Sequence, residues 1–174
     1  RLNSAIGTGE VLMEEIRSII DAIEIGVNRY ARLSGVSDEV FRRPYAPGKW
    51  TGHEILGHVA DSEMACYIRV LQGIAEEGNE LAELQLDGER WVRELRYHER
   101  PAAVSLAAIQ GTRTALLHVL RTTPEERLRR ELIHPTMGKV TPLFYAKIPA
   151  EHGMHHLEQL EAILDRSTSG SEKT

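Results

Sequence analysis

Three histidines in the segment EHGMHHLEQ have the residue type and spacing of a metal site. His152 and His156 are four residues apart, so on a helix they point within about 40° of each other. Two imidazoles in this arrangement can bind one divalent ion, as in helical zinc motifs, although Gly153 stands where an HExxH motif carries its general-base glutamate. His155 lies three residues after His152 and is an alternative partner for it. The spacing predicts that His152 chelates an ion together with either His156 or His155, and does not decide between the two.

The apolar stripe of this segment indicates which histidines face inward. His152 and His156 flank the stripe, so both are expected to point into the protein, whereas His155 is expected to face solvent or a subunit contact. The stripe consists of Ile148, Leu157, Leu160 and Ile163.

A third ligand is expected from His58, in the apolar segment ILGHVADSE. Alone, such a histidine is more often a core residue bonded to a carbonyl. With a helical pair facing it across the core, three neutral imidazoles can form one side of a metal site. A fourth position would stay open for water or substrate, which is typical of catalytic rather than structural sites.

Two further residues are candidates to assist the chemistry. Asp61 lies three residues after His58 on a similar helix face, and an ordinary exposed charge is an equally good interpretation. His134 precedes Pro135 in a loop near the expected mouth of the site, where it either contacts substrate or caps the loop. Asp61 and His134 are therefore the predicted catalytic residues.

Two polar residues lie on the same helix faces as the predicted ligands. Gln159, three residues after His156, is placed to accept the second ring N–H of that ligand. Arg69, eleven residues after His58, returns to within about 20° of the same direction. It suits an anionic group, and a surface ion pair is an equally good interpretation.

The elements that must position these residues are long amphipathic helices. Thr51 and Glu54 form a capping box, and Thr141 with Pro142 has the pattern of a second helix start. Residues 131–141 are expected to form a loop or a small hairpin. Long helices are expected at about 9–33, 51–75, 101–121 and 141–165, with shorter helical turns at 37–43, 87–97 and after Pro124. This pattern predicts an all-α four-helix bundle with long connections and short extra helical turns.

Length and composition set further limits. The expected organisation is a flexible N-terminus over residues 1–8, one domain over residues 9–166 and a disordered tail over residues 167–174. A net charge of −5, without a clustered basic face, argues against nucleic-acid binding. Cys66 is the single cysteine, so no disulfide can form within the chain, and we expect a small buried residue in a cytoplasmic protein. No apolar run approaches the roughly 20 residues of a membrane span.

Three segments resemble a known family. Pro47 to Glu63, PGKWTGHEILGHVADSE, is similar to the second-helix signature of the DinB-like superfamily, most closely its YfiT-like branch. His134 to Thr141 resembles the loop before the last helix of that branch, and Tyr145 to Leu160 resembles its closing metal-binding helix. The resemblance extends over roughly residues 10–165.

The resemblance implies a four-helix bundle with a three-histidine site for nickel, zinc or another divalent ion. Carried over by position, its ligands are His58, His152 and His156, which places His155 outside the site. Members are often homodimers. Some are metal-dependent hydrolases of small molecules, and others are S-transferases that use a low-molecular-weight thiol as co-substrate.

Two classes of function are therefore compatible with the sequence. In an enzyme, the ion would lower the pKa of a water or thiol so that it attacks at neutral pH. A hydrolase would use water assisted by Asp61 or His134, whereas an S-transferase would use an external thiol. The alternative is a non-catalytic metal-binding module that dimerises in a stress response. A fourth protein ligand that completes the coordination of the ion would favour this alternative.

Overall fold

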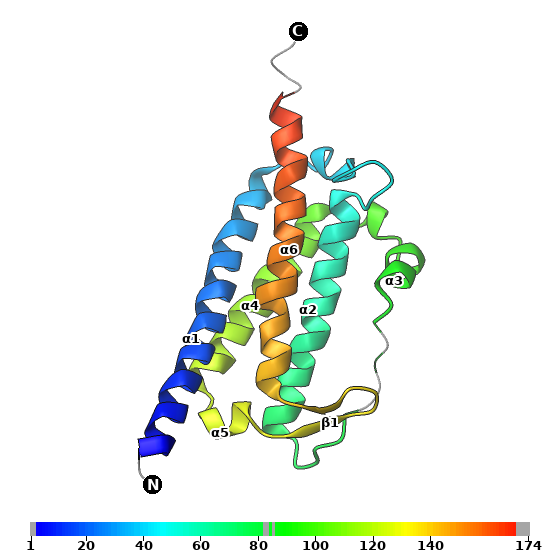
Figure 1. The fold of residues 1–174 in the computed structure, drawn as a ribbon. Helices are drawn as coiled ribbons and strands as arrows, with labels where there is room; N and C mark the ends of the chain where they lie inside the picture. Colours follow the sequence, from blue (N-terminus) through cyan, green and yellow to red (C-terminus); the bar gives the residue numbers. More distant parts are fainter. Residues whose placement is uncertain (1–2, 82–83, 85, 170–174) are drawn as a thin grey trace.

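Four long helices dominate the computed structural model, which describes residues 3–81, 84 and 86–169 (Figure 1). They are α1 (Asn3–Arg32), α2 (Gly52–Ala75), α4 (Ala102–Thr122) and α6 (Pro142–Ser169). The connections carry the short helices α3 (Gly88–Glu94) and α5 (Glu125–Leu128) and the 3-10 turns η1 (Leu33–Gly35), η2 (Val40–Arg42) and η3 (Tyr97–Glu99). The predicted all-α four-helix bundle is confirmed. None of the described helices is long and apolar enough to span a membrane.

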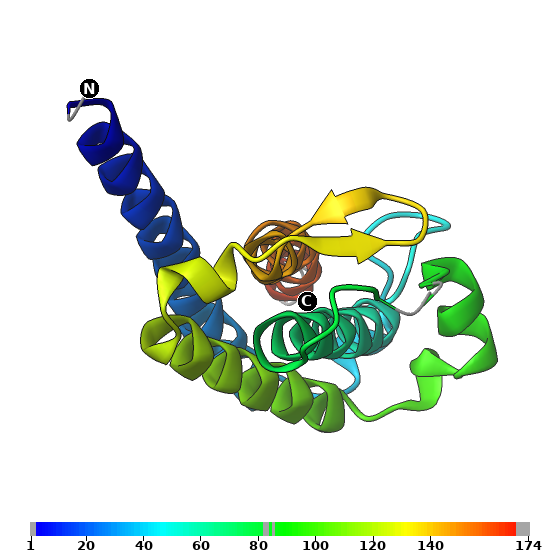
Figure 2. The same cartoon turned by 90° about the horizontal axis from the view of Figure 1, so that it is seen from below.

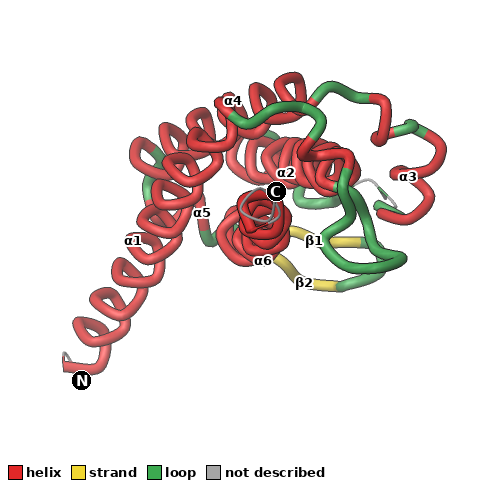
Figure 3. The backbone as a smooth tube through the Cα atoms, turned by 90° about the horizontal axis from the view of Figure 1, so that it is seen from above, coloured by secondary structure: helices red, strands yellow, loops and turns green. Residues whose placement is uncertain are grey.

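The helices form a ring in which sequence neighbours are not always spatial neighbours. Helix α2 packs against α4 and α6, and α1 packs against the same two helices from the other side. Views from below and above show α6 and α2 side by side, while the start of α1 extends away from the bundle (Figures 2 and 3). The two elements that carry the predicted ligands are therefore direct neighbours.

A small hairpin closes the lower end of the bundle. Strands β1 (Leu132–His134) and β2 (Gly138–Val140) pair antiparallel, so of the loop and the small hairpin expected over residues 131–141 the structure has the hairpin. Gly138 has a φ of +74°, a left-handed conformation that glycine adopts without strain. The hairpin lies beside the first turns of α6 and the last turns of α2 (Figure 2).

The core consists of two apolar clusters at different heights. The lower cluster includes Ile23, Val70, Leu116 and Ala150, one from each long helix. The upper cluster includes Tyr30, Ala60, Ile109 and Leu157, again one from each. In each long helix, the residues between its lower-cluster residue and its upper-cluster residue lie at the boundary between the two clusters.

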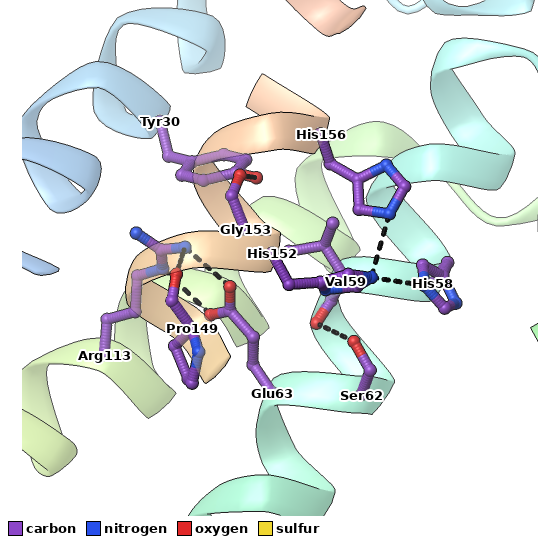
Figure 4. A network of polar contacts seen from close by, with 10 residues as sticks. All are labelled: Tyr30, His58, Val59, Ser62, Glu63, Arg113, Pro149, His152, Gly153 and His156. Atoms are coloured by element: carbon purple, nitrogen blue, oxygen red, sulfur yellow. Dashed lines mark hydrogen bonds and ion pairs between the residues drawn. The ribbon is translucent and has the colours of Figure 1, made fainter. Parts of the chain in front are cut away.

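A buried ion pair occupies that boundary (Figure 4). Arg113 of α4 donates from Nε and Nη2 to the two carboxylate oxygens of Glu63 on α2, at 2.8 and 2.6 Å. Both side chains are fully buried. Arg113 Nη2 also donates to the carbonyl of Pro149 in α6 at 3.0 Å, and the guanidinium lies over the ring of Tyr30 on α1, whose hydroxyl donates to the Gly153 carbonyl at 2.8 Å. The pair therefore connects all four long helices.

Two glycines make room for this pair. A Cβ atom at Gly153 would lie 2.1 Å from Arg113 Nη2 and 2.4 Å from Glu63 Oε1, and one at Gly26 would lie 1.8 Å from Arg113 Nη1. These distances are far below van der Waals contact. The backbones of α1 and α6 can reach the guanidinium only without a side chain at these positions.

The capping box is present as predicted. Thr51 accepts the backbone N–H of Glu54 through its hydroxyl, and the Glu54 carboxylate accepts the Thr51 backbone N–H at 2.7 Å. Because the box fixes the first turn of α2, it also fixes where His58 lies in the second turn.

The helix ends differ from the sequence-based expectation. Helix α1 begins at Asn3 rather than at residue 9, because adding a turn to an existing helix costs less than nucleating one, even without an apolar stripe. Helix α6 continues to Ser169, three residues into the predicted tail. The segment expected to be one helix over residues 87–97 is two, separated at Arg96 by a φ of 51°. Residues 1–2 and 170–174, parts of the expected flexible termini, lie outside the described residues.

We expect Gly153→Ala to destabilise the protein by about 1–3 kcal/mol, because the new methyl group forces apart a locked buried ion pair. Gly111→Ala is the matched control, since it adds the same methyl group in α4 with nothing within 4 Å. It should stabilise by about 0.5–1 kcal/mol through helix propensity. Urea unfolding of both variants measures the difference, and a stabilising Gly153→Ala would contradict this account of the glycine.

Candidate metal centre

Three imidazoles converge between α2 and α6 (Figure 4). The Nε2 atom of His152 lies 3.2 Å from Nε2 of His58 and 3.1 Å from Nε2 of His156. One ring nitrogen from each residue lies within 4.8 Å of the other two. An ion with tetrahedral geometry and metal–nitrogen bonds of about 2.0–2.1 Å keeps its ligand nitrogens roughly 3.3 Å apart. The structure thus brings together the three predicted ligands at a spacing that suits a metal ion.

Helix geometry produces this convergence. The four-residue step places the rings of His152 and His156 with their centroids 4.4 Å apart and nearly perpendicular, at 84°. The ring of His58 reaches them from the neighbouring helix, with its centroid 5.1 Å from each. His58 and His152 are 94 residues apart in sequence, and their ring nitrogens nevertheless meet at one point.

The surroundings favour neutral imidazoles. Burial, followed by the neighbouring imidazoles, lowers the pKa of His58 to about 4. The same causes lower the pKa of His152 to about 4, and burial lowers the pKa of His156. A metal binds only the unprotonated ring, so the site is ready to accept a cation near neutral pH.

Gln159 sets the tautomer of one ligand. His156 Nδ1 lies 2.8 Å from Gln159 Oε1, and an amide oxygen only accepts, so Nδ1 carries the proton and Nε2 keeps its lone pair toward the cluster. The amide nitrogen of Gln159 donates to His155 Nε2 at 3.2 Å, which holds the amide in this orientation. His155 thus lies outside the triad and supports it. His152 differs, because its Nδ1 is buried without a hydrogen-bond partner among the described residues.

A pocket of about 320 Å³ opens beside the triad. The ring of Trp50 forms its wall, stacked on His156 at 6.1 Å and tilted against His58 at 5.0 Å. The Trp50 indole N–H donates to Glu89 of α3 at 3.4 Å. Polar groups in its lining come from Lys49, Glu89 and Gln159. Of the three histidines, His156 lines this pocket, together with one positive and one negative side chain.

Neither Trp50 nor Glu89 was predicted from the sequence to line this pocket. The position of Trp50, directly before the Thr51 cap, is a usable signal, because that end of α2 also carries His58. No sequence pattern around Glu89 predicts its position in this pocket, because that position depends on the path of the connection after α2. That path brings Gly88 so close that a Cβ there would lie 3.1 Å from Cε1 of His58.

Asp61 is occupied by another interaction. Both of its oxygens accept from Arg100, each at 2.9 Å, and Oδ2 also accepts from the Tyr97 hydroxyl at 2.7 Å. The carboxylate thus ties α2 to the connection before α4. A catalytic role for Asp61 stays a prediction, and it requires this ion pair to open.

His134 lies apart from the triad, in the hairpin. Its Nδ1 accepts the backbone N–H groups of Thr136 and Met137, each at 3.2 Å, so it stabilises the hairpin turn. This contact is the loop-capping alternative that the sequence left open, and a catalytic role stays a prediction. Cys66 is buried, as expected, and burial raises the pKa of its thiol to about 12.

We expect the metal-free protein to lose stability as the pH falls from about 6.5 to about 4. His58 and His152 titrate near pH 4 when folded and near 6.5 when unfolded, so in this window the unfolded chain binds more protons and acid favours unfolding. Urea unfolding across the window measures the slope. His58→Gln should reduce it, and His118→Gln, at an exposed position of α4, should not. An equal slope in His58→Gln and wild type would count against the lowered pKa.

We expect Gln159→Leu to weaken zinc binding roughly 10–100-fold, because it removes the acceptor that fixes the tautomer of His156. Titration of untagged protein against a competing chelator measures the affinity. His152→Ala should abolish binding at the same zinc concentration, and His118→Ala should leave it unchanged. Wild-type affinity in Gln159→Leu would show that the amide has no part in ligand orientation.

Comparison with known proteins agrees with this fold. A family model described as the DinB superfamily matches residues 28–160. Two proteins of Oceanobacillus iheyensis, each named "Putative metal-dependent hydrolase", are 28% and 24% identical to this chain. The first match covers 91% of this chain and 89% of the relative, and the second covers 93% and 92%.

A solved structure has the same architecture. It is YfiT from Bacillus subtilis, described as "a probable metal-dependent hydrolase with an unusual four-helix bundle topology". The match has a TM-score of 0.71 at 22% identity and covers 91% of this chain and 89% of that one. These findings confirm the resemblance seen in the sequence motifs. Because the family model spans more than half of its length, this chain belongs to the DinB superfamily.

Proposed function

We propose that this protein is a metal-dependent hydrolase of small molecules that holds a zinc or nickel ion with His58, His152 and His156. The observation that carries the proposal is the convergence of three neutral imidazoles beside an open pocket. Structural metal sites saturate their ion with protein ligands, whereas three ligands and an accessible pocket are typical of catalysis. The names of the relatives support the same class of reaction.

A divalent ion held by the three histidines would supply Lewis acidity, which lowers the pKa of water and polarises a carbonyl group. The chain contributes the rest. His156 is held by Gln159, so its orientation is set before substrate arrives. Trp50 covers two of the imidazoles and limits the water around them. Lys49 and Glu89 line the same pocket and place a positive and a negative charge where substrate enters.

One observation favours thiol transfer as a second candidate. Hydrolysis benefits from a nearby base, and both oxygens of Asp61 are engaged by Arg100 and Tyr97. A thiol has a pKa near 8.5 and needs less help to ionise than water. The thiol would be an external low-molecular-weight compound, because Cys66 is buried and its pKa is raised to about 12.

We expect the zinc- or nickel-loaded protein to hydrolyse activated esters or amides at least about a hundredfold faster than the His152→Ala variant, which lacks one ligand. His118→Ala is the control and should keep full activity. In parallel, conjugation of low-molecular-weight thiols to an electrophile tests the second candidate. Thiol conjugation without hydrolysis would replace the first proposal by the second. Metal binding without either reaction would leave a non-catalytic metal-binding module.

A further inference from the structure

The outer face of α1 carries a continuous row of exposed side chains. Met13, Arg17, Asp21 and Ile25 follow one another at four-residue steps, so they form one ridge along the helix, the α1 ridge. Met13 is 41% exposed and Ile25 is 52% exposed, and the two charged side chains between them are exposed as well. The α1 ridge is therefore apolar at both ends, with a positive and a negative charge at its centre.

This ridge points away from the core of the bundle. The helical turn places its mean direction roughly 150° from that of the side chains that α1 buries in the core. Those side chains are Ile16, Ile19, Ile23 and Tyr30. A hollow of about 940 Å³ lies along the ridge, and the described residues that line it all belong to α1. The ridge is thus open to another molecule along its length.

The two central charges are unpaired within the described part of the chain. The side chains of Arg17 and Asp21 form no ion pair or hydrogen bond with another residue that the structure describes. Their four-residue spacing favours such a pair within a helix less when the cation lies nearer the N-terminus, as it does here. Glu24, three residues further along α1, is by contrast held by Arg121 of α4. The ridge therefore offers one free charge of each sign.

The order of the four side chains is complementary to its own reverse. Two ridges can run in opposite directions about a two-fold axis midway between Arg17 and Asp21. Each arginine then meets the aspartate of the second copy, and each Met13 meets the Ile25 of the second copy, so every contact occurs twice. In a parallel arrangement, like charges would meet. The charges thus select an antiparallel pair of identical helices.

The shape of the helix surface suits the same arrangement. Rows of residues four apart interlock in the commonest class of helix packing. The row beside the α1 ridge contains Ser18 and Ala22, whose small side chains leave a groove for the ridge of the second copy. The stretch from residue 13 to residue 25 is only about 18 Å long, so the contact is smaller than a standard interface and reversible.

We propose that two copies of this chain associate through the α1 ridge, with their α1 helices antiparallel. The apolar ends supply the area that is removed from water, and the two central ion pairs fix the direction of pairing. None of the described residues that line the pocket beside the triad belongs to α1, so association leaves this pocket open.

Sedimentation velocity of the untagged chain over a wide range of concentration tests the association. We expect a monomer–dimer equilibrium. Arg17→Glu and Asp21→Arg should each weaken it about tenfold or more, because two attractive contacts become repulsive. An equimolar mixture of the two variants should recover the wild-type affinity, since each copy offers the charges that the other lacks. Arg90→Glu, at an exposed arginine of α3 on the other side of the molecule, is the matched control and should associate like wild type (Figure 1).

A covalent cross-link tests the direction of pairing. The double variant Met13→Cys/Ile25→Cys should give covalent dimers with a short bismaleimide, because these two positions meet across the axis. Met13→Cys alone should not, since the two copies of position 13 lie about 18 Å apart along the helices. Cys66 is buried, so the wild-type chain should not react and serves as the control.

Three results in the sedimentation experiment would overturn the proposed surface. They are a monomer at every concentration, wild-type association of Arg17→Glu, and no recovery in the mixture of the two variants. Covalent dimers of Met13→Cys alone would overturn the antiparallel direction. Urea unfolding at low concentration, where the chain is monomeric, should give the same midpoint for each variant and wild type, so that a lost dimer is distinguished from a lost fold.

Discussion

The buried pair of Glu63 and Arg113 is the interaction on which the rest of this structure depends. Removing two charges from water costs several kcal/mol for each ion, and this cost is offset only by close geometry and further hydrogen bonds. Here the geometry is bidentate, and the further contacts come from Pro149 of α6 and Tyr30 of α1. An ion pair that tolerates little displacement therefore fixes four helices at one height.

The same pair determines the spacing of the candidate metal centre. Glu63 follows His58 by five residues on α2, and Gly153, which lies against the pair, directly follows His152 on α6. A shift of α6 by one residue would move its histidines about 1.5 Å along the axis and rotate them by about 100°. The distance of 3.2 Å between the Nε2 atoms of His58 and His152 thus depends on a contact that lies outside the triad.

The sequence alone predicted the features that depend on residues close together in the chain. The four-residue step of His152 and His156 and the capping box at Thr51 follow from helix geometry, and the structure places them accordingly. Partners that are distant in sequence do not follow from such local patterns. Arg113 is 50 residues from Glu63 and Arg100 is 39 residues from Asp61, and nothing in the sequence links them. Gly153 was interpreted only as the missing glutamate of a zinc motif, because its steric role exists only once Arg113 lies against it.

The ring order of the helices has a consequence for how the chain is made. Helix α1 packs on α4 and α6, and α2 packs on the same two, so the first two long helices contact mainly elements that leave the ribosome later. Helix α6 is the last of these and brings two of the three histidines with it. During synthesis, which proceeds from the N-terminus, neither apolar surface can be fully covered until α6 emerges. The nascent bundle is therefore most exposed to aggregation just before its three clustered histidines can meet.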